Sequence, residues 1–115
     1  METITIKLPT IDQINFELIA EYESMPVKGN AMASGDEKVD KKVEDSIIRR
    51  INNGNVWAWA AVELKGTYKG LEFSDHLGCC SYKSKADFKQ PGGYYDDMKQ
   101  VVYDGIIEAL KQFSA

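Results

Sequence analysis

Histidine, cysteine and long apolar runs are scarce in this chain of 115 residues, and each shortage excludes a class of chemistry. The only histidine and both cysteines lie within the stretch HLGCCSYKS, residues 76–84. In an extended strand, His76 and Cys80 share one face but stand roughly 13 Å apart, too far for one metal ion, while Cys79 points the other way. We therefore expect no metal site, no disulfide and no cysteine nucleophile, with both thiols as small packing residues and His76 as an ordinary strand residue.

A large charge of one sign is also missing. The 18 acidic and 14 basic side chains are mixed along the chain and leave a net charge of −4, which argues against a duplex nucleic-acid partner. No run approaches the ~20 apolar residues of a membrane span, and METITIKLP alternates polar and apolar residues, unlike a signal peptide. We therefore expect a cytoplasmic protein without a membrane partner.

The sequence contains no group of residues that reads as a catalytic site. Adjacent carboxylates occur three times, and each pair suits a helix cap, a helix dipole or solvation: Asp36 with Glu37, Glu44 with Asp45, and Asp96 with Asp97. The glycines at 92 and 93 have the right chemistry to cradle a phosphate, but the aspartates that follow would repel it. We expect a protein that is not an enzyme and that has no cofactor.

The apolar pattern predicts one α+β domain over residues 1–115. It consists of an antiparallel sheet of about four strands with two helices, in the order β-β-α-β-β-α, and the strands cover 3–8, 15–25, 56–68 and 71–82. An S-x-x-E capping box at Ser34–Glu37 begins the first helix, which ends at Asn53 and Gly54. Its apolar stripe is Val39, Val43, Ile47, Ile48 and Ile51.

QPGGYYDD begins the second predicted helix. Its buried stripe is Tyr95, Met98, Val102, Ile106, Ala109, Leu110 and Phe113. The apolar arc is wider than this stripe, because Val101, Tyr103 and Ile107 extend it on both sides. A helix with so wide an arc usually packs against two partners, so we expect a homodimer or a higher homo-oligomer.

Two tryptophans lie in the third predicted strand, VWAWAAVELKGTY. One face of this strand carries Val56, Ala58, Ala60, Val62 and Leu64. We assign that face to the core, because its small alanines leave room for a helix to lie close. Trp57 and Trp59 then lie on the opposite face, as a second core surface, a subunit interface or a binding surface.

Several aromatic and basic residues have no assigned role at this point. They are Trp57, Trp59, Tyr82, Tyr94 and Tyr95 together with Lys28, Arg49, Arg50, Lys83 and Lys85. Aromatic faces stack on nucleobases with ~1–3 kcal/mol each, and a few cations neutralise phosphates. In the alternative interpretation the tryptophans are core or dimer interface and the cations are simply solvated.

The motifs GNAMASGD, VWAW and GGYYDDM, in this order, resemble those of a widespread family of small phage and plasmid proteins, over roughly residues 20–110. This family is similar in turn to phage anti-defence proteins of the Thoeris-inhibitor type, compact homo-oligomers that sequester cyclic nucleotide immune signals without cleaving them. The resemblance implies a nucleotide sponge in the host cytoplasm, with Tyr82 stacking on the base and Lys83 or Arg49 holding the phosphates. Trp57 and Lys28 complete the expected ligand-binding set.

A second hypothesis is an inhibitor that binds a host defence protein directly. Its hot spot would be the face of Trp57 and Trp59, since aromatic residues are enriched at such interfaces. The two hypotheses differ in the surface that they need. A sponge requires cations beside aromatics in a concavity, whereas a protein inhibitor requires only an aromatic patch.

Overall fold

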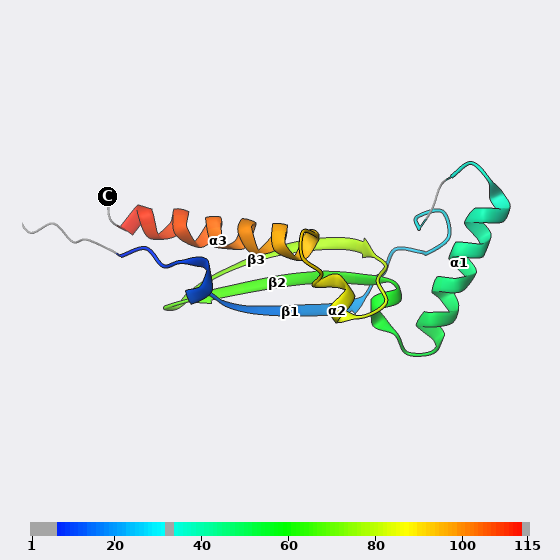
Figure 1. Ribbon diagram of the computed structural model, residues 1–115, viewed down its shortest axis with the longest axis horizontal. Coiled ribbons are helices and arrows are strands. Elements are labelled where there is room, and N and C mark those ends of the chain that lie inside the picture. The colour runs from blue at the N-terminus through cyan, green and yellow to red at the C-terminus, as the bar shows by residue number, and fades with distance from the viewer. Residues whose placement is uncertain (1–6, 32–33, 114–115) are drawn as a thin grey trace, which may run out of the picture.

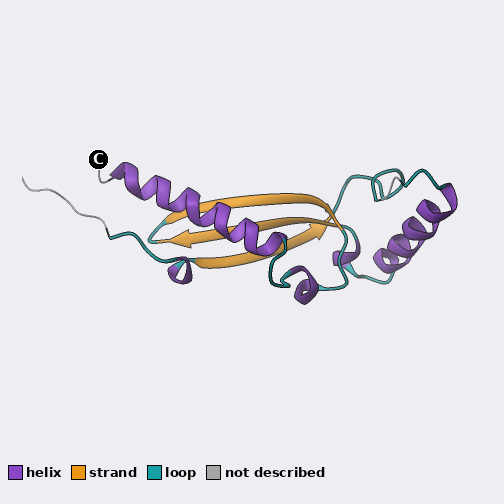
Figure 2. Cartoon of the chain, turned by 45° about the horizontal axis from the view of Figure 1, so that its top comes forward, coloured by secondary structure: helices purple, strands orange, loops and turns teal. Residues whose placement is uncertain are grey.

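The computed structural model describes residues 7–31 and 34–113. Three strands, β1 (Asn15–Tyr22), β2 (Ala60–Tyr68) and β3 (Leu71–Cys80), form one antiparallel sheet in the order β1-β2-β3. The helices of the described chain are α1 (Glu37–Asn52), α2 (Lys85–Phe88) and α3 (Tyr94–Phe113). Two short 3-10 turns are η1 (Ile11–Gln13) and η2 (Val56–Ala58). Figures 1 and 2 show α3 lying along one face of the sheet, and α1 beyond the end of the strands.

The predicted α+β class is confirmed, but the sheet has three described strands rather than about four. Residues 3–6 of the strand expected over 3–8 lie outside the described residues, and Lys7 and Leu8 are not in a strand. The segment between the first two predicted strands, which we expected to form a hairpin, contains η1. The strand β1 pairs with β2 instead, and the paired residues Tyr22 and Ala60 are 38 positions apart in the sequence. The short α2 was not predicted.

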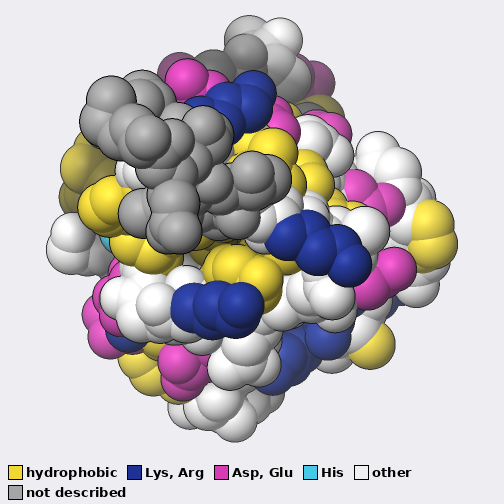
Figure 3. Space-filling model, turned by 90° about the vertical axis from the view of Figure 1, so that its left-hand side faces the viewer, with side chains coloured by type: hydrophobic (Ala, Val, Ile, Leu, Met, Phe, Trp, Pro, Cys, Tyr) yellow, Lys and Arg dark blue, Asp and Glu magenta, His cyan; other side chains and the backbone are white. Residues whose placement is uncertain are grey.

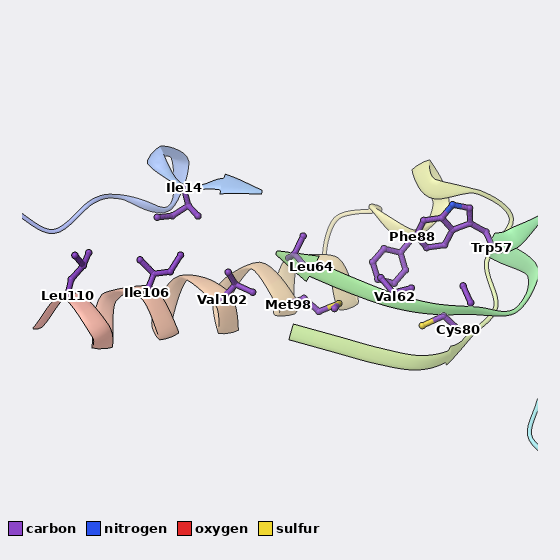
Figure 4. Close-up of a cluster of buried hydrophobic side chains, with 11 residues drawn as sticks. Ile14, Trp57, Val62, Leu64, Cys80, Phe88, Met98, Val102, Ile106 and Leu110 are labelled. Atoms are coloured by element: carbon purple, nitrogen blue, oxygen red, sulfur yellow. The ribbon is translucent and has the colours of Figure 1, made fainter. Parts of the chain in front are cut away.

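One face of the sheet packs against α3 and forms the main core. Along β2 the buried residues alternate, with Ala60, Val62 and Leu64 each 2 % exposed or less, as the period-two pattern predicted. Figure 4 shows the apolar stripe of α3 lined up along this face, with Trp57 and Phe88 at one end of the cluster. The buried residues of α3 are Met98, Val102, Ile106 and Leu110. These four were predicted, whereas Phe113 is 66 % exposed.

The two tryptophans do not share one face of a strand, and of the alternatives left open for them the structure supports burial in the core. The side chain of Asn55 accepts a hydrogen bond from the amide of Trp57 (3.1 Å) and caps η2, so the alternation of a strand begins only at Ala60. Trp57 is 8 % exposed and belongs to the main core. Trp59 is 3 % exposed and belongs to a second cluster. Neither indole is therefore exposed enough to serve as a flat binding patch.

This second cluster attaches α1 to the end of the sheet. Its buried members are Val27, Ile47, Ala58 and Trp59. The indole Nε1 of Trp59 donates to the carbonyl of Met25 (2.7 Å), which holds the loop before α1 in place. Of the predicted stripe of α1, Val39 and Ile48 are about two-fifths exposed. The chain extends over 70 × 27 × 24 Å, so α1 forms an arm rather than a second layer.

The first helix begins with a different cap from the one expected. The carboxylate of Asp36 accepts hydrogen bonds from the amides of Lys38 (3.0 Å) and Val39 (3.4 Å). Ser34 is engaged elsewhere, because its hydroxyl donates to Asp40 (2.7 Å). The end of the helix agrees with the sequence, since Asn53 is the C-cap.

A β-bulge near the end of β3 changes the faces of its residues. Ala60 pairs with Cys80 but Val62 pairs with Leu77, so β3 carries one extra residue. Cys79 takes a positive φ of 55° at this point. Cys80 consequently faces the main core, whereas His76 lies on the opposite face beside Glu63, so the expectation that they share a face is wrong. Cys80 is buried as expected, and Cys79 is exposed.

Candidate functional site

Tyr82 lies beside a pocket of about 290 Å³ at the end of β3. The walls of this pocket come from Leu77 to Tyr82 and from Tyr94, the first residue of α3. Tyr94 is 57 % exposed, whereas Tyr82 is half-buried with its ring edge-on to Phe88 at 4.9 Å between centroids. The pocket therefore offers two tyrosines, but no lysine or arginine lines it.

The backbone around Tyr82 is tied down by several hydrogen bonds. The amide of Tyr82 donates to the carbonyl of Trp57 (2.8 Å), and the carbonyl of Tyr82 accepts from the guanidinium of Arg50. The carbonyl of Lys83 accepts from the side chain of Asn55 (3.2 Å), and its amide donates to Asp87 (3.0 Å). Burial raises the pKa of the Tyr82 hydroxyl, so the neutral phenol is present at physiological pH.

Arg50, rather than Arg49, reaches the Tyr82 loop. Arg49 is exposed in the last turn of α1, and its side chain makes no hydrogen bond or ion pair with the described residues. Helical spacing carries the signal that sequence reasoning missed: Arg50 follows the buried Ile47 by three residues and shares its side of the helix.

The five residues predicted to bind the ligand do not form one site. Tyr82 and Lys83 are adjacent, and Trp57 lies beneath them in the core, where its ring packs on Phe88 at 5.2 Å. Lys28 lines a separate pocket of about 480 Å³ against α1, which shares no residue with the Tyr82 pocket. Four carboxylates line that second pocket with Lys28 and Lys41: Glu37, Asp40, Glu44 and Asp45.

Cations lie beside aromatic rings elsewhere on the molecule. The ammonium groups of Lys89 and Lys99 stand 5.2 and 5.4 Å from the ring centroid of Tyr95. Neither lysine lines any of the three pockets. Figure 3, which views the end of the molecule where α3 finishes, shows Lys and Arg interspersed with hydrophobic and acidic side chains. The combination of cations, aromatics and a concavity is thus not assembled at any of these pockets.

The cysteines sit in different environments within the bulge. Cys80 is buried, and loss of hydration raises the pKa of its thiol to about 11, so it is not a thiolate at neutral pH. The exposed Cys79 donates its amide to the carboxylate of Glu23 (3.1 Å). That bond, together with one from the amide of Met25 (3.1 Å), lowers the pKa of the Glu23 carboxyl. Glu23 therefore helps to hold the bulge.

The outer face of the sheet, opposite α3, is covered by no described helix. We define it by the residues that alternate with the buried ones: Asn15, Glu17, Ile19 and Glu21 on β1; Ala61, Glu63, Lys65 and Thr67 on β2; Glu72, Ser74, His76 and Gly78 on β3. Four glutamates thus share this face with one lysine and one histidine. The face is acidic.

A hollow of about 330 Å³ lies in this outer face. Ile19 and the small residues Ala61 and Gly78 contribute its apolar surface, and Glu21, Glu63 and His76 its polar groups. His76 Nε2 stands 3.6 Å from a carboxylate oxygen of Glu63, and Lys65 stands 3.7 Å from Glu72. Sequence reasoning treated His76 as a plain strand residue and did not single out its neighbours, because only the strand register brings β1 and β3 together across β2.

Within residues 7–31 and 34–113, no group of three or more His, Cys, Asp or Glu side chains is arranged to hold a metal ion. No helix in this part of the chain has the length and apolar character needed to cross a membrane. Comparison with protein-family models, with curated proteins and with solved structures found no match for this chain.

Proposed function

We propose that this chain is a non-catalytic binding protein that contacts another protein through the outer face of its sheet. The hollow in that face carries the proposal, because it combines an apolar floor with charged groups on its rim. Antiparallel sheets commonly leave one face to water, so the lack of a covering helix alone would favour no function. A hollow that places Ile19 between carboxylates resembles the apolar centre and polar rim of a protein interface.

This proposal keeps direct protein contact but moves it away from the tryptophans. Trp57 and Trp59 are buried beneath η2 and α1, so they stabilise the scaffold instead of forming the hot spot. Both are close to the joint between the sheet and α1. The outer face belongs to the part of the molecule in which the three strands and α3 share one core.

Photo-cross-linking in cells that produce the protein tests this function. A photoreactive phenylalanine analogue replaces Ile19 in one variant and Gln100, on the exposed side of α3, in a matched control. We expect a defined adduct with another polypeptide from position 19 and none from position 100. Adducts from neither position, or the same adducts from both, would contradict the proposal.

Sequestration of a cyclic nucleotide is the second candidate, and the pocket between Tyr82 and Tyr94 favours it. One exposed and one half-buried tyrosine flank the pocket, and the resemblance to phage anti-defence proteins supports this use. Lys83, next to Tyr82 in the sequence, would supply charge, whereas Arg49 does not line this pocket and Lys28 lines a different one. The lining lacks a cation, so this candidate ranks below protein contact.

Calorimetric titration with a panel of cyclic oligonucleotides and cyclic ADP-ribose isomers tests sequestration. If one base stacks on each ring, Tyr94→Ala and Tyr82→Ala should each weaken binding by roughly 1–3 kcal/mol. Tyr22→Ala, which removes an exposed tyrosine from outside this pocket, is the control. An absence of heat for every ligand, or equal losses in all three variants, would exclude this pocket.

The homo-oligomer stays a prediction, with less support than the apolar arc suggested. Tyr103 donates its hydroxyl to the carbonyl of Pro9 (2.8 Å), and Ile107 packs against the main core. Val101 is the member of the widened arc that remains exposed, at 47 %. Light scattering at micromolar concentration tests it: a mass of 12.9 kDa identifies a monomer, and a multiple of it an oligomer.

A further inference from the structure

The outer face differs from most solvated sheet faces in its charge. Glu17, Glu21, Glu63 and Glu72 project from the same face as Lys65 and His76. Lys65 is already close to Glu72, at 3.7 Å. Counted without His76, four negative charges against one positive charge leave this face with an excess of three negative charges, so it favours a cationic partner and repels anions.

Within the hollow, two carboxylates can approach one cation. Glu21 pairs with Ala61 across β1 and β2, and Glu63 is two residues further along β2, so the two glutamates are diagonal neighbours. Side chains in this relationship have Cβ atoms roughly 7–8 Å apart, a span that one ammonium or guanidinium group can bridge. Ala61 leaves the space between them open because its side chain is a single methyl group.

These carboxylates hold no strong internal partner. Glu21 makes no ion pair with the described residues. The only such partner of Glu63 among them is His76, whose Nε2 is 3.6 Å away. The side chain of His76 is 61 % exposed, and that of Glu63 is 34 % exposed. Such an exposed pair contributes little stability, so replacing His76 by an incoming cation costs the fold little.

The apolar part of the hollow suits the stem of a long cationic side chain. Lysine and arginine bury their methylene groups against apolar surface while the charged end stays near carboxylates or water. Ile19 and Ala61 offer that surface directly beside Glu21 and Glu63. A second copy of this chain is disfavoured as the occupant, because it would present the same acidic face, and a nucleic acid is disfavoured by its phosphates.

We propose that the outer face binds a positively charged segment of another protein, and that the hollow receives one lysine or arginine side chain between Glu21 and Glu63. This inference rests on the proposed function, since it names the chemistry of the partner at the same surface. The remaining glutamates of the face, Glu17 and Glu72, then meet further basic residues of an extended segment.

The test is fluorescence anisotropy with a rhodamine-labelled peptide in which lysine and alanine alternate, beside the same peptide with glutamate for lysine. The double variant Glu21→Gln, Glu63→Gln removes two charges from the hollow. Asp12→Asn with Glu108→Gln removes the same charge from η1 and α3, outside this face. We expect the lysine peptide alone to bind, with affinity reduced at least about tenfold by the first pair and less than about twofold by the second.

A second variant keeps the proposal testable if the double variant folds poorly. Ala61→Arg places a tethered guanidinium in the hollow, so it should abolish peptide binding while circular dichroism stays unchanged. Equal losses from both double variants, no loss from Ala61→Arg, or no binding of the lysine peptide would overturn the inference. A position-19 adduct without peptide binding would refute only the cationic partner, whereas failure of cross-linking would refute the protein contact itself.

Discussion

The two faces of the sheet carry different tasks, although they belong to the same three strands. On the face toward α3, Ala60, Val62 and Leu64 are buried in the main core, which is made of apolar side chains. On the outer face, Ala61, Glu63 and Lys65 are half-exposed and two of the three carry charge. Because successive residues of a strand point to opposite sides, one stretch of β2 stabilises the fold and also contributes to the surface that we propose for binding.

Because the two faces differ, substitutions on them should change different properties of the protein. A change on the face toward α3 alters packing density in the main core, so it should appear in the free energy of unfolding. A change on the outer face alters charge and shape in the hollow, so it should appear in binding and leave unfolding nearly unchanged.

The largest stability effect should come from Leu64→Ala. Leu64 is fully buried between the sheet and α3, so the lost transfer free energy and the cavity together cost about 2–5 kcal/mol. Urea denaturation measures this, with Lys65→Ala on the outer face as the neighbouring control. The control should change the unfolding free energy by less than about 1 kcal/mol. Similar losses for both variants would show that the faces are not energetically distinct.

The next largest effect should come from Gly66→Ala, because the backbone of β2 lies close to α3 at this residue. A Cβ atom at position 66 would overlap Cγ1 of Val102 and come within 3.1 Å of Ile14. Overpacking of this kind costs about 1–3 kcal/mol. The added substitution Val102→Ala opens space, so a double-mutant cycle should show a favourable interaction energy. Strict additivity would mean that α3 does not approach the strand this closely.

Arg50→Met should cost less than either core change. It removes a charged hydrogen bond to the carbonyl of Tyr82, worth about 1–2 kcal/mol at a half-buried site. It should also speed hydrogen exchange in the loop of residues 81–84, which Arg50 joins to α1. Arg49→Met removes the same charge from the exposed neighbour and is the control. Equal rates of hydrogen exchange in the two variants would show that Arg50 does not hold the loop of residues 81–84 to α1.

The smallest expected effect is the contribution of Glu23 to the pH dependence of stability. Its folded pKa is lowered by hydrogen bonds from the amides of Cys79 and Met25, so its contribution is present above the ordinary value of 4.5. That contribution is lost as the pH falls through the folded pKa. The shift in urea midpoint between pH 7 and pH 3 should therefore be smaller in Glu23→Gln than in the wild type. A Glu17→Gln control on β1 should retain the full shift.

Periodicity predicted the parts of the fold in which side chains alternate without interruption. The face of β2 from Ala60 to Leu64 and four members of the predicted stripe of α3, Met98, Val102, Ile106 and Leu110, are correct for this reason. The sequence could not reveal η2 or the bulge at Cys79, because each depends on a local backbone conformation that breaks the period. Both errors moved particular side chains: Trp57 into the core and His76 to the outer face.

The candidate site was less predictable than the fold. Tyr82 lines its pocket and Lys83 follows it in the sequence, but the positions of Lys28 and Arg49 depend on how α1 lies beyond the sheet. The hollow depends on strand register, which brings Glu21, Glu63 and His76 together from three strands. In the sequence these three residues look like ordinary solvated positions.

The most direct measurement of the central claim is amide chemical-shift mapping of the intact protein during titration with the lysine–alanine peptide. We expect the largest shifts on the outer face, at Ile19, Ala61 and Glu63, with the amides of α3 nearly unmoved. Shifts concentrated on α3 or around Tyr82 and Tyr94, or spread evenly over the surface, would contradict a binding site in the acidic hollow.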